Sequence, residues 1–258
     1  MKVITFASFK GGSGKTTTAI ATAAALVDSG NYRVFVLDLD NRQNSLSRWL
    51  SDTRSVYGED APDKATLDGA SIALEADHPD AISEMHRLLT QASRNYDICI
   101  IDTQGTQNPV SITAMRFTDL VIVPVQISGI EIEPFVATYK LAEGAVKFEG
   151  ARVVGLSTRM PNIASTTMIK TREVLGRYGI EIVDGTSQRD GYQQLVYESG
   201  TFDMIHRKFQ NEAEAASDSK AKRRALNECK KTETTRNETL AMLGRLGVLE
   251  ETPQENVT

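Results

Sequence analysis

The sequence predicts an α/β fold, with one domain built on a mostly parallel, twisted sheet that is flanked by helices on both faces. Apolar, strand-like runs alternate with segments of helical periodicity, which is typical of strands joined by helical crossovers. The strand-like runs are apolar on both faces, as expected for a sheet covered on each side. The expected strands are 2–8, 33–38, 97–102, 119–125, 152–158 and 180–183, and the expected helices are 15–29, 79–94, 131–148 and 166–178. The polar stretch 52–77 has no clear periodicity and stays unassigned.

Length and composition suit a single α/β domain. The chain has 258 residues, and no apolar run is long enough for a transmembrane helix. A strand-like run begins at once, so we expect no signal peptide. Cys99 and Cys229 are the two cysteines and lack metal-ligand spacing, which favours a reducing cytoplasm. The formal charge of −5 argues against a generally basic surface but leaves room for a local basic patch.

The most informative segment lies between the first expected strand and the first expected helix. Its glycines let backbone N–H groups turn toward phosphate oxygens, and the segment leads into a helix N-terminus with its partial positive charge. In such a loop Lys15 contacts the β- and γ-phosphates, and the Thr16 hydroxyl holds Mg²⁺. The sequence therefore predicts a P-loop NTPase. The loop residues are Lys10, Gly11, Gly12, Ser13, Gly14, Lys15, Thr16 and Thr17.

The loop departs from the usual pattern G-x-x-x-x-G-K-[ST], because Phe9 stands at the first glycine position and Lys10 precedes the double glycine. K-G-G-x-G-K-T-T is the deviant Walker A signature of the ParA/MinD class of dimeric ATPases, and the chain resembles that family. The resemblance implies ATP and Mg²⁺ as cofactors, an ATP-dependent homodimer and weak basal hydrolysis. It also implies that Lys10 reaches across the dimer to the phosphates of the other subunit, and that Lys10, Lys15 and Asp40 are the catalytic residues.

Two strand-like runs end in acidic residues. Asp38 ends the run 33–38 and Asp40 lies two positions later, and their spacing places both side chains on one face at the carboxyl end of a strand. The pair is similar to the D-x-D switch I element of the family, which implies that Asp40 positions or activates the attacking water while Asp38 supports the loop and the Mg²⁺ shell. Asp102 ends the run 97–102 in a Walker B arrangement, accepting from a Mg²⁺-bound water or from the Thr16 hydroxyl. The implied metal site comprises Thr16, Asp38, Asp40 and Asp102.

Both switch segments differ from the family pattern. Asn41-Arg42-Gln43-Asn44 replaces Pro-Gln-Gly, and Thr103-Gln104-Gly105 replaces Thr-Pro-Pro-Gly. We therefore expect slow turnover until a partner orders these loops, and the sequence leaves open whether hydrolysis reaches a normal rate. A plain N-cap or a solvated loop acid is the alternative interpretation of Asp38 and Asp40.

The turn after 152–158 and the segment Gln188-Arg189-Asp190 are similar to stretches that wall the adenine in ParA relatives. The resemblance places Arg159 and Pro161 near the base. The alternatives are a surface arginine and a turn proline.

The C-terminal part carries a cluster of basic residues within an otherwise acidic chain. Because ParA proteins bind nonspecific double-stranded DNA through basic C-terminal residues, the resemblance implies salt-sensitive phosphate contacts here. Acidic residues are interspersed, so an ordinary solvated helix face is the alternative. We expect a core over 1–205, a helical segment packed on it over 206–249 and an acidic disordered tail over 250–258. The candidate DNA-binding residues are Arg207, Lys208, Lys220, Lys222, Arg223, Arg224, Lys230 and Lys231.

An apolar stripe with helical spacing runs through 240–249. MinD-type relatives use a terminal amphipathic helix to bind membrane, but here acidic residues follow the stripe, so we expect a helix docked on the domain and no membrane contact.

Within the family, short phrases such as Ser47-Arg48-Trp49 resemble VirC-type proteins of plasmid conjugation, and the core resembles ParA proteins without an N-terminal helix-turn-helix domain. The implied function is plasmid or chromosome partition, or conjugative transfer, and the sequence does not choose between them. The implied partner is a ParB-like or relaxosome-type protein, and the implied location is the cytoplasm, at the nucleoid or a plasmid. A MinD-like membrane-cycling regulator and a P-loop metabolic ligase are the alternatives.

Overall fold

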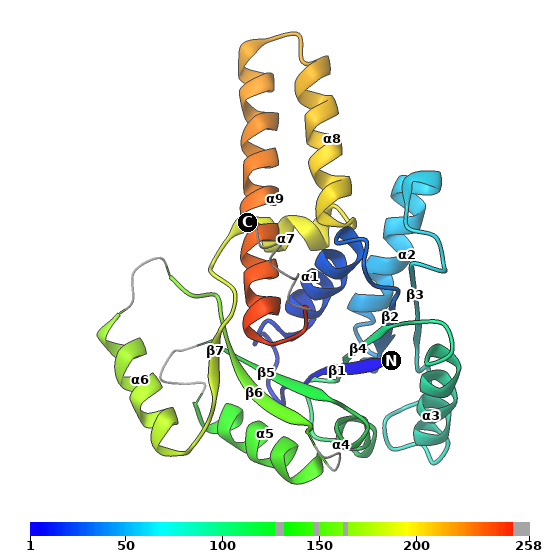
Figure 1. Ribbon diagram of the computed structural model, residues 1–258, viewed down its shortest axis with the longest axis vertical. Coiled ribbons are helices and arrows are strands. Elements are labelled where there is room, and N and C mark those ends of the chain that lie inside the picture. Colours follow the sequence, from blue (N-terminus) through cyan, green and yellow to red (C-terminus); the bar gives the residue numbers. More distant parts are fainter. Residues whose placement is uncertain (127–131, 147–149, 162–164, 250–258) are drawn as a thin grey trace, which may run out of the picture.

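The computed structural model describes residues 1–126, 132–146, 150–161 and 165–249. Within them the chain forms a seven-stranded sheet in which every pair of neighbours is parallel, so the predicted α/β fold is confirmed (Figure 1). The strand order is β3-β2-β4-β1-β5-β6-β7. The strands are β1 (Lys2–Phe6), β2 (Val34–Asp38), β3 (Leu67–Ser71), β4 (Ile98–Asp102), β5 (Leu120–Gln126), β6 (Arg152–Thr158) and β7 (Ile182–Asp184).

Helices cover both faces of this sheet (Figure 1). One face packs against the Ala-rich helix α1 together with α2, α7, α8 and α9, and the other face packs against α3, α4, α5 and α6. The helices are α1 (Lys15–Asp28), α2 (Ser45–Tyr57), α3 (Ala81–Ala92), α4 (Pro109–Arg116), α5 (Ile132–Ala145), α6 (Thr166–Arg177), α7 (Asp190–Tyr197), α8 (Phe202–Ala215) and α9 (Ser219–Arg245). The four helices expected from periodicity are α1, α3, α5 and α6. The ends of the expected helix 131–148 lie outside the described residues.

The unassigned stretch 52–77 contains the edge strand β3, which has a physical reason to escape detection. Its sequence is Leu-Asp-Gly-Ala-Ser, and only Leu67 is buried. Gly69 sits so close to β2 and α2 that an added Cβ would lie 2.4 Å from Val36 and 3.0 Å from Leu50. Because this strand has one buried side chain and a glycine where the neighbouring segments pack closely, its sequence contains no apolar run that would predict a strand.

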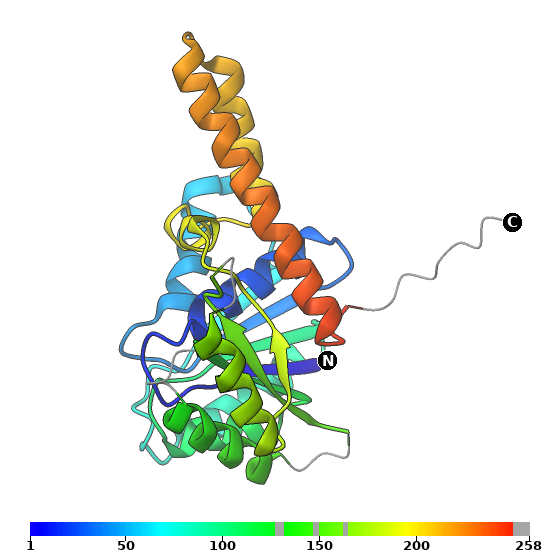
Figure 2. The ribbon, with the colours of Figure 1, turned by 90° about the vertical axis from the view of Figure 1, so that its left-hand side faces the viewer.

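The C-terminal part forms a helical hairpin, α8 and α9, that rises from the core (Figures 1 and 2). The boundary expected at residue 206 falls inside α8, because this first helix of the hairpin already begins at Phe202. The base of the hairpin is anchored, since Phe202, Ile205 and Leu243 are buried in the core. Residues 216–218 connect the two helices at the far end.

The apolar stripe expected at 240–249 is buried at the foot of α9. Met242, Leu243, Leu246 and Val248 are at most 4% exposed, and all four belong to the core cluster on this face of the sheet. Carbonyl groups at this end receive hydrogen bonds from the core, including one from the Lys2 ammonium to Gly247 at 2.7 Å. Among the helices described, none combines the length and the apolar character needed to cross a membrane.

Candidate functional site

The glycine-rich loop lies at the carboxyl edge of the sheet, between β1 and α1. Gly12 and Gly14 adopt positive φ angles of 82° and 90°, which side chains with a Cβ rarely adopt. The Thr158 hydroxyl at the end of β6 donates to the Ser13 carbonyl at 2.8 Å and holds the loop from the side. The loop curves around a cavity of about 260 Å³, whose lining comprises residues 10–17, Ile20, Asp40, Gln43, Ser45, Gly105, Arg159 and Val196.

Lys15, Thr16 and Asp102 converge at the floor of this loop. The Lys15 ammonium lies 2.6 Å from Asp102 Oδ1, and the Thr16 hydroxyl donates to Asp102 Oδ2 at 2.6 Å. Lys15 is 7% exposed and Asp102 is 1% exposed, so the ion pair is buried. Burial raises the pKa of the Asp102 carboxyl above its usual range, while the Lys15 charge opposes that shift. One of the two contacts expected for Asp102, from the Thr16 hydroxyl, is therefore present.

The two acids of the switch I segment occupy different environments. Asp38 is fully buried beside Asp102 on the neighbouring strand, and its carboxylate accepts the backbone N–H groups of Asp40 and Ser47, both at 3.0 Å. Burial raises the pKa of Asp38 to about 6, although the Ser47 hydrogen bond opposes the shift. Asp40 lies beyond the strand and lines the phosphate-loop cavity. Asp38 thus braces the loop while Asp40 faces the cavity.

The two variant switch segments contact each other directly. The Gln104 side-chain amide donates to Asn41 Oδ1 at 2.7 Å, and Gln104 Oε1 accepts from the Asn108 side chain at 3.1 Å. Asn108 in turn caps α4 by accepting the Ser111 N–H. The replacements that distinguish this chain from the family pattern therefore form one hydrogen-bonded cluster, which joins the segment after β2 to the segment after β4.

A second cavity, of about 210 Å³, continues from the loop past the end of β6. It shares Gly14, Thr17 and Arg159 with the phosphate-loop cavity. Arg159 has a positive φ of 53° and lines both cavities, whereas Pro161 is exposed and lines neither. The lining also includes Thr158, Thr186, Ser187 and Gln193, which sequence reasoning missed. Local signals existed in the turn after 152–158, which adjoins Thr158, and in the segment Gln188-Arg189-Asp190, which adjoins Ser187.

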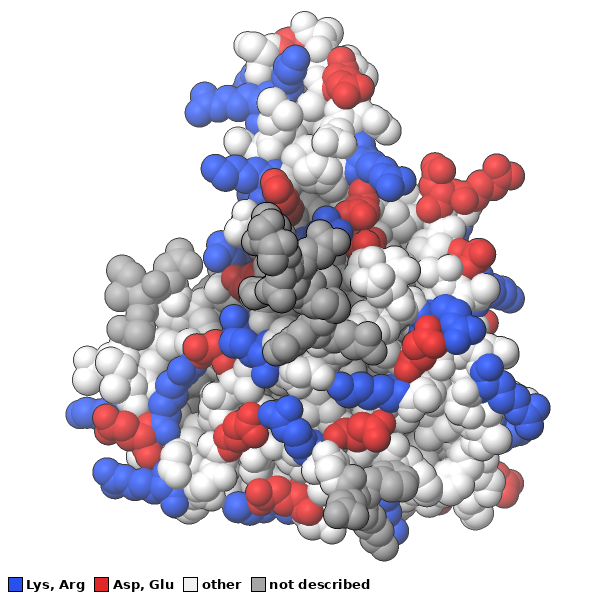
Figure 3. All heavy atoms as spheres, viewed as in Figure 1, with Lys and Arg blue, Asp and Glu red and all other residues white. Residues whose placement is uncertain are grey.

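The structure brings five of the eight candidate DNA-binding residues into one place. They line a cleft of about 660 Å³ between α7 and α9, and Figure 3 shows Lys and Arg side chains gathered along the α9 edge of the hairpin. Lys222 and Arg207 are exposed outside the cleft, and Lys208 is ion-paired with Glu198. We call this surface the basic cleft; its cationic residues are Arg189, Lys220, Arg223, Arg224, Lys230 and Lys231.

The basic cleft is not uniformly cationic. Asp190 and Glu228 also line it, and Lys231 is paired with Glu228 at 2.9 Å. Within the described part of the chain, Lys220, Arg223, Arg224 and Lys230 form no ion pair. These four exposed side chains are the cations most available to an incoming anion.

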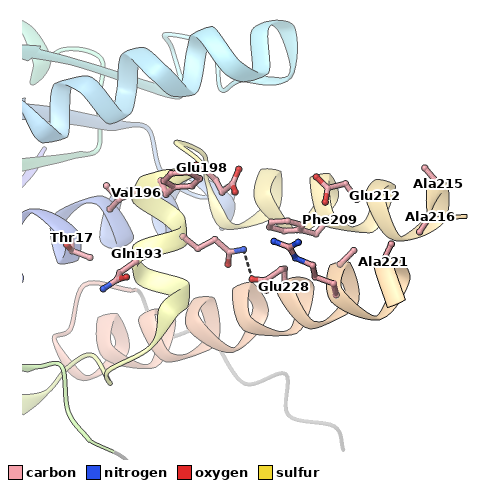
Figure 4. A pocket seen from close by; sticks show the side chains of 14 residues that line it. Thr17, Gln193, Val196, Glu198, Phe209, Glu212, Ala215, Ala216, Ala221 and Glu228 are labelled. Atoms are coloured by element: carbon pink, nitrogen blue, oxygen red, sulfur yellow. Dashed lines mark hydrogen bonds between the residues drawn. The ribbon is translucent and has the colours of Figure 1, made fainter. Parts of the chain in front are cut away.

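A further cavity, of about 1120 Å³, lies between α7 and the hairpin (Figure 4). Phe209 and Glu212 reach it from α8, and Gln194 donates across it to Glu228 at 3.1 Å. Thr17 lines this cavity as well as the phosphate-loop cavity, so the space beneath the hairpin adjoins the nucleotide side of the molecule.

Comparison with known proteins shows the family to which the chain is similar. The family described as ATPase MipZ matches residues 2–147. Among curated proteins, VirC1 of Rhizobium radiobacter is 28% identical over 140 residues, covering 54% of this chain and 55% of VirC1. The chromosome-partitioning ATPase Soj of Thermus thermophilus is 34% identical over 141 residues, covering 48% and 54% respectively. The matches thus span about half the length of these relatives.

A solved structure extends the likeness to almost the whole chain. The ATP complex of a McdA variant from Cyanothece has a TM-score of 0.65 at 15% identity, and the match covers 98% of each chain. At this identity the likeness establishes the fold, which includes the C-terminal hairpin region that the family match does not reach.

Proposed function

The chain belongs to the family of MipZ ATPases, which is of the ParA/MinD type, and from this we propose that it is an ATP-dependent dimerising switch. In its ATP state it binds double-stranded DNA without sequence preference, and hydrolysis releases the DNA. The observation that carries the proposal is the pairing of a phosphate loop, closed on the buried Lys15–Asp102–Thr16 cluster, with a basic cleft on the same molecule.

The loop has the features that a triphosphate requires. Its two positive-φ glycines leave backbone N–H groups free to face the cavity, and the α1 N-terminus adds its partial positive charge. The Ser13 hydroxyl is buried and makes no hydrogen bond in the described structure, so it is available to a ligand oxygen. On ATP binding, Lys15 would exchange its Asp102 partner for the β- and γ-phosphates.

Mg²⁺ fits the residues at the floor of the loop. The Thr16 hydroxyl and the Asp102 carboxylate already lie within 2.6 Å of each other, and both are oxygen donors of the kind Mg²⁺ prefers. The ion neutralises phosphate charge when bound. Asp38 is buried behind them and acts through the loop that it braces, so its contribution to the metal shell is indirect.

Hydrolysis would depend on the residues that face the cavity. Asp40 is the acid that lines it and would orient the attacking water. Lys10 also lines it, and in a dimer it would reach the phosphates of the other subunit, neutralising charge as the γ-phosphoryl group departs. The Gln104–Asn41 cluster would have to rearrange before these groups align, which supports a slow basal rate and stimulation by a partner.

The DNA contact would be made by the basic cleft. Its exposed cations follow one face of α9, so they suit a row of phosphates. Contacts to phosphates carry no sequence information, which supports binding without sequence preference. Dimerisation would double the number of such contacts, and binding through many weak phosphate contacts rises steeply with that number. The biological setting we propose is plasmid or chromosome partition, or conjugative transfer, in the cytoplasm at the nucleoid or a plasmid, with a ParB-like or relaxosome-type partner.

One alternative retains an observation in its favour. The large cavity beneath the hairpin adjoins Thr17 and has room for a small-molecule substrate, as a P-loop ligase would need. The membrane-cycling alternative loses its support, because the apolar side chains of 240–249 are buried in the core.

A gel-shift experiment tests the proposal. Duplexes of unrelated sequence are titrated with the protein without nucleotide, with ADP, with ATP and with a slowly hydrolysed ATP analogue, at two salt concentrations. Lys10→Ala and Lys15→Ala are run beside the wild type, and Lys170→Ala on α6 serves as a control for removing a lysine elsewhere. We expect binding in the triphosphate states alone, lost in both loop variants, kept in the control and weakened by salt.

Two outcomes would contradict the proposal. Equal binding in every nucleotide state would make the DNA contact independent of the ATPase site. No binding in any state, combined with ATP hydrolysis that responds to a small metabolite, would favour the ligase.

A further inference from the structure

The second cavity, of about 210 Å³ past the end of β6, is called here the base-side cavity. One of its walls is a short segment, residues 186–189, that has no regular secondary structure of its own. Its backbone is attached to the end of β6: the Thr186 N–H donates to Ser157 at 3.0 Å, and the Gln188 N–H donates to Met160 at 2.8 Å. These bonds fix one side of the segment. The other side depends on a residue that lies fifty positions later in the chain.

That residue is Glu238, on α9. Its carboxylate accepts three hydrogen bonds: from the Ser187 backbone N–H at 2.5 Å, from Arg189 Nε at 2.8 Å and from the Tyr192 hydroxyl at 2.9 Å. The Glu238 side chain is 14% exposed. Donors from a loop, from a helix N-cap and from a helix therefore meet on one nearly buried carboxylate, which is a strong and geometrically demanding arrangement.

The contact between α7 and α9 is tight enough to make this attachment rigid. A Cβ added at Gly191 would lie 2.0 Å from the Thr235 hydroxyl, so the α7 backbone packs directly against the Thr235 side chain of α9. Glu238 lies one turn beyond Thr235 on α9. The position of the carboxylate is thus set by direct backbone-to-helix packing.

Glu238 lines neither the base-side cavity nor the phosphate-loop cavity, but the residues it holds do. Ser187 and Arg189 line the base-side cavity, and Arg189 lines the basic cleft as well. One arginine is therefore shared between the two surfaces, and its guanidinium is oriented from α9.

We propose that Glu238 is a positioning residue for nucleotide recognition: through Ser187 and Arg189 it holds the base-side wall, so that selection of the base depends on the helix that forms the basic cleft. This rests on the proposed function, because it requires that the cavity bind a nucleoside triphosphate. The phosphate loop makes no contact with Glu238, so recognition of the phosphates alone does not depend on it.

The test compares Glu238→Gln with Glu233→Gln, a matched loss of charge at an exposed position on the same helix. Calorimetry measures the affinity of each protein for ATP, for GTP and for inorganic tripolyphosphate, with Mg²⁺ present. Arg189→Gln, which breaks the same ion pair from its exposed end, provides a second variant that leaves the nearly buried Glu238 carboxylate in place. Thermal melting confirms that each variant is folded.

We expect Glu238→Gln and Arg189→Gln each to weaken ATP binding by about tenfold and to reduce the preference for ATP over GTP, with tripolyphosphate binding unchanged. Glu233→Gln should match the wild type for all three ligands. If both variants bind ATP and GTP like the wild type, or if they lose tripolyphosphate equally, the inference is overturned while the proposed function stands. If the wild type binds no nucleotide, the proposed function fails and the inference fails with it.

Discussion

Replacing two cations of the basic cleft should change how DNA binding depends on salt. Arg223→Ala and Lys230→Ala remove exposed side chains that form no ion pair within the described part of the chain, so neither change leaves a buried charge behind. Two cations per chain amount to about four per dimer. Because each phosphate contact contributes about 0.9 to the slope of log K against log salt, the slope should become shallower by about 3 to 4.

The same arithmetic gives a change that is easy to measure. Between about 0.05 and 0.2 M salt the wild type should lose about 100-fold more affinity than the double variant, since fewer counterions are released. Fluorescence anisotropy of a labelled duplex, titrated with protein and ATP at four salt concentrations, supplies the slopes. Lys170→Ala with Arg177→Ala, on α6 across the sheet from the hairpin, is the matched control and should retain the wild-type slope. Equal slopes for all three proteins would refute the assignment of DNA contacts to the basic cleft.

Three further predictions concern stability and the loop. Burial raises the pKa of Asp28 to about 6, so protonation of Asp28 stabilises the fold fully below about pH 4, and this contribution is lost as the pH rises through 6. The wild type should therefore gain unfolding free energy between pH 7 and pH 4, and Asp28→Asn should remove about 2 kcal/mol of that gain. Denaturant titrations at a series of pH values in which both proteins respond alike would contradict this. At Gly14 the φ angle is 90°, and an added Cβ would lie 3.4 Å from the Thr158 side chain. Gly14→Ala should therefore cost about 1–2 kcal/mol of stability and abolish ATP binding measured by calorimetry, and an unchanged affinity would count against the loop assignment. Gly191→Ala should lower the unfolding free energy by about 2 kcal/mol or more because its Cβ would overlap Thr235, and a melting temperature equal to that of the wild type would argue against the close α7–α9 contact.

The parts of the site that sequence could predict are those encoded within a few residues. The phosphate loop needs glycines, lysines and a helix start in immediate succession, and Asp102 needs only an apolar strand before it. Both patterns can be recognised in a single sequence, and the parallel sheet then brings the ends of β1 and β4 together because these strands are neighbours. The contact between Thr16 and Asp102, 86 positions apart, follows from that topology.

The parts that could not be predicted depend on packing between distant segments. The strand β3 has one buried side chain, so no local pattern announces it. The sequence indicated a helical C-terminal segment, but not that it forms a hairpin, because the far half of that hairpin exposes polar residues on most sides. Glu238 is one acid among many on α9, and what distinguishes it is that Ser187 and Arg189 meet it in space.

Residues that belong to one motif or one cluster in the sequence lie in different environments in the structure. Asp38 and Asp40 share a motif, yet one is fully buried with backbone N–H partners and the other lines the cavity. Likewise, the basic residues of the C-terminal part divide between the cleft, the exposed flank of the hairpin and an ion pair with Glu198. The charge pattern of the sequence therefore predicted the candidate basic residues, and the orientation of α8 and α9 determines which of them lie in the cleft.

The measurement that bears most directly on the ATP-gated switch is sedimentation velocity of the protein with a short duplex, carried out with ATP, with ADP and with Lys10→Ala in ATP. We expect wild-type protein with ATP to form a complex that holds two chains on the duplex, and we expect free duplex in the other two samples. A single chain bound to the duplex equally in all three samples would contradict a switch in which ATP closes a dimer and the dimer holds DNA.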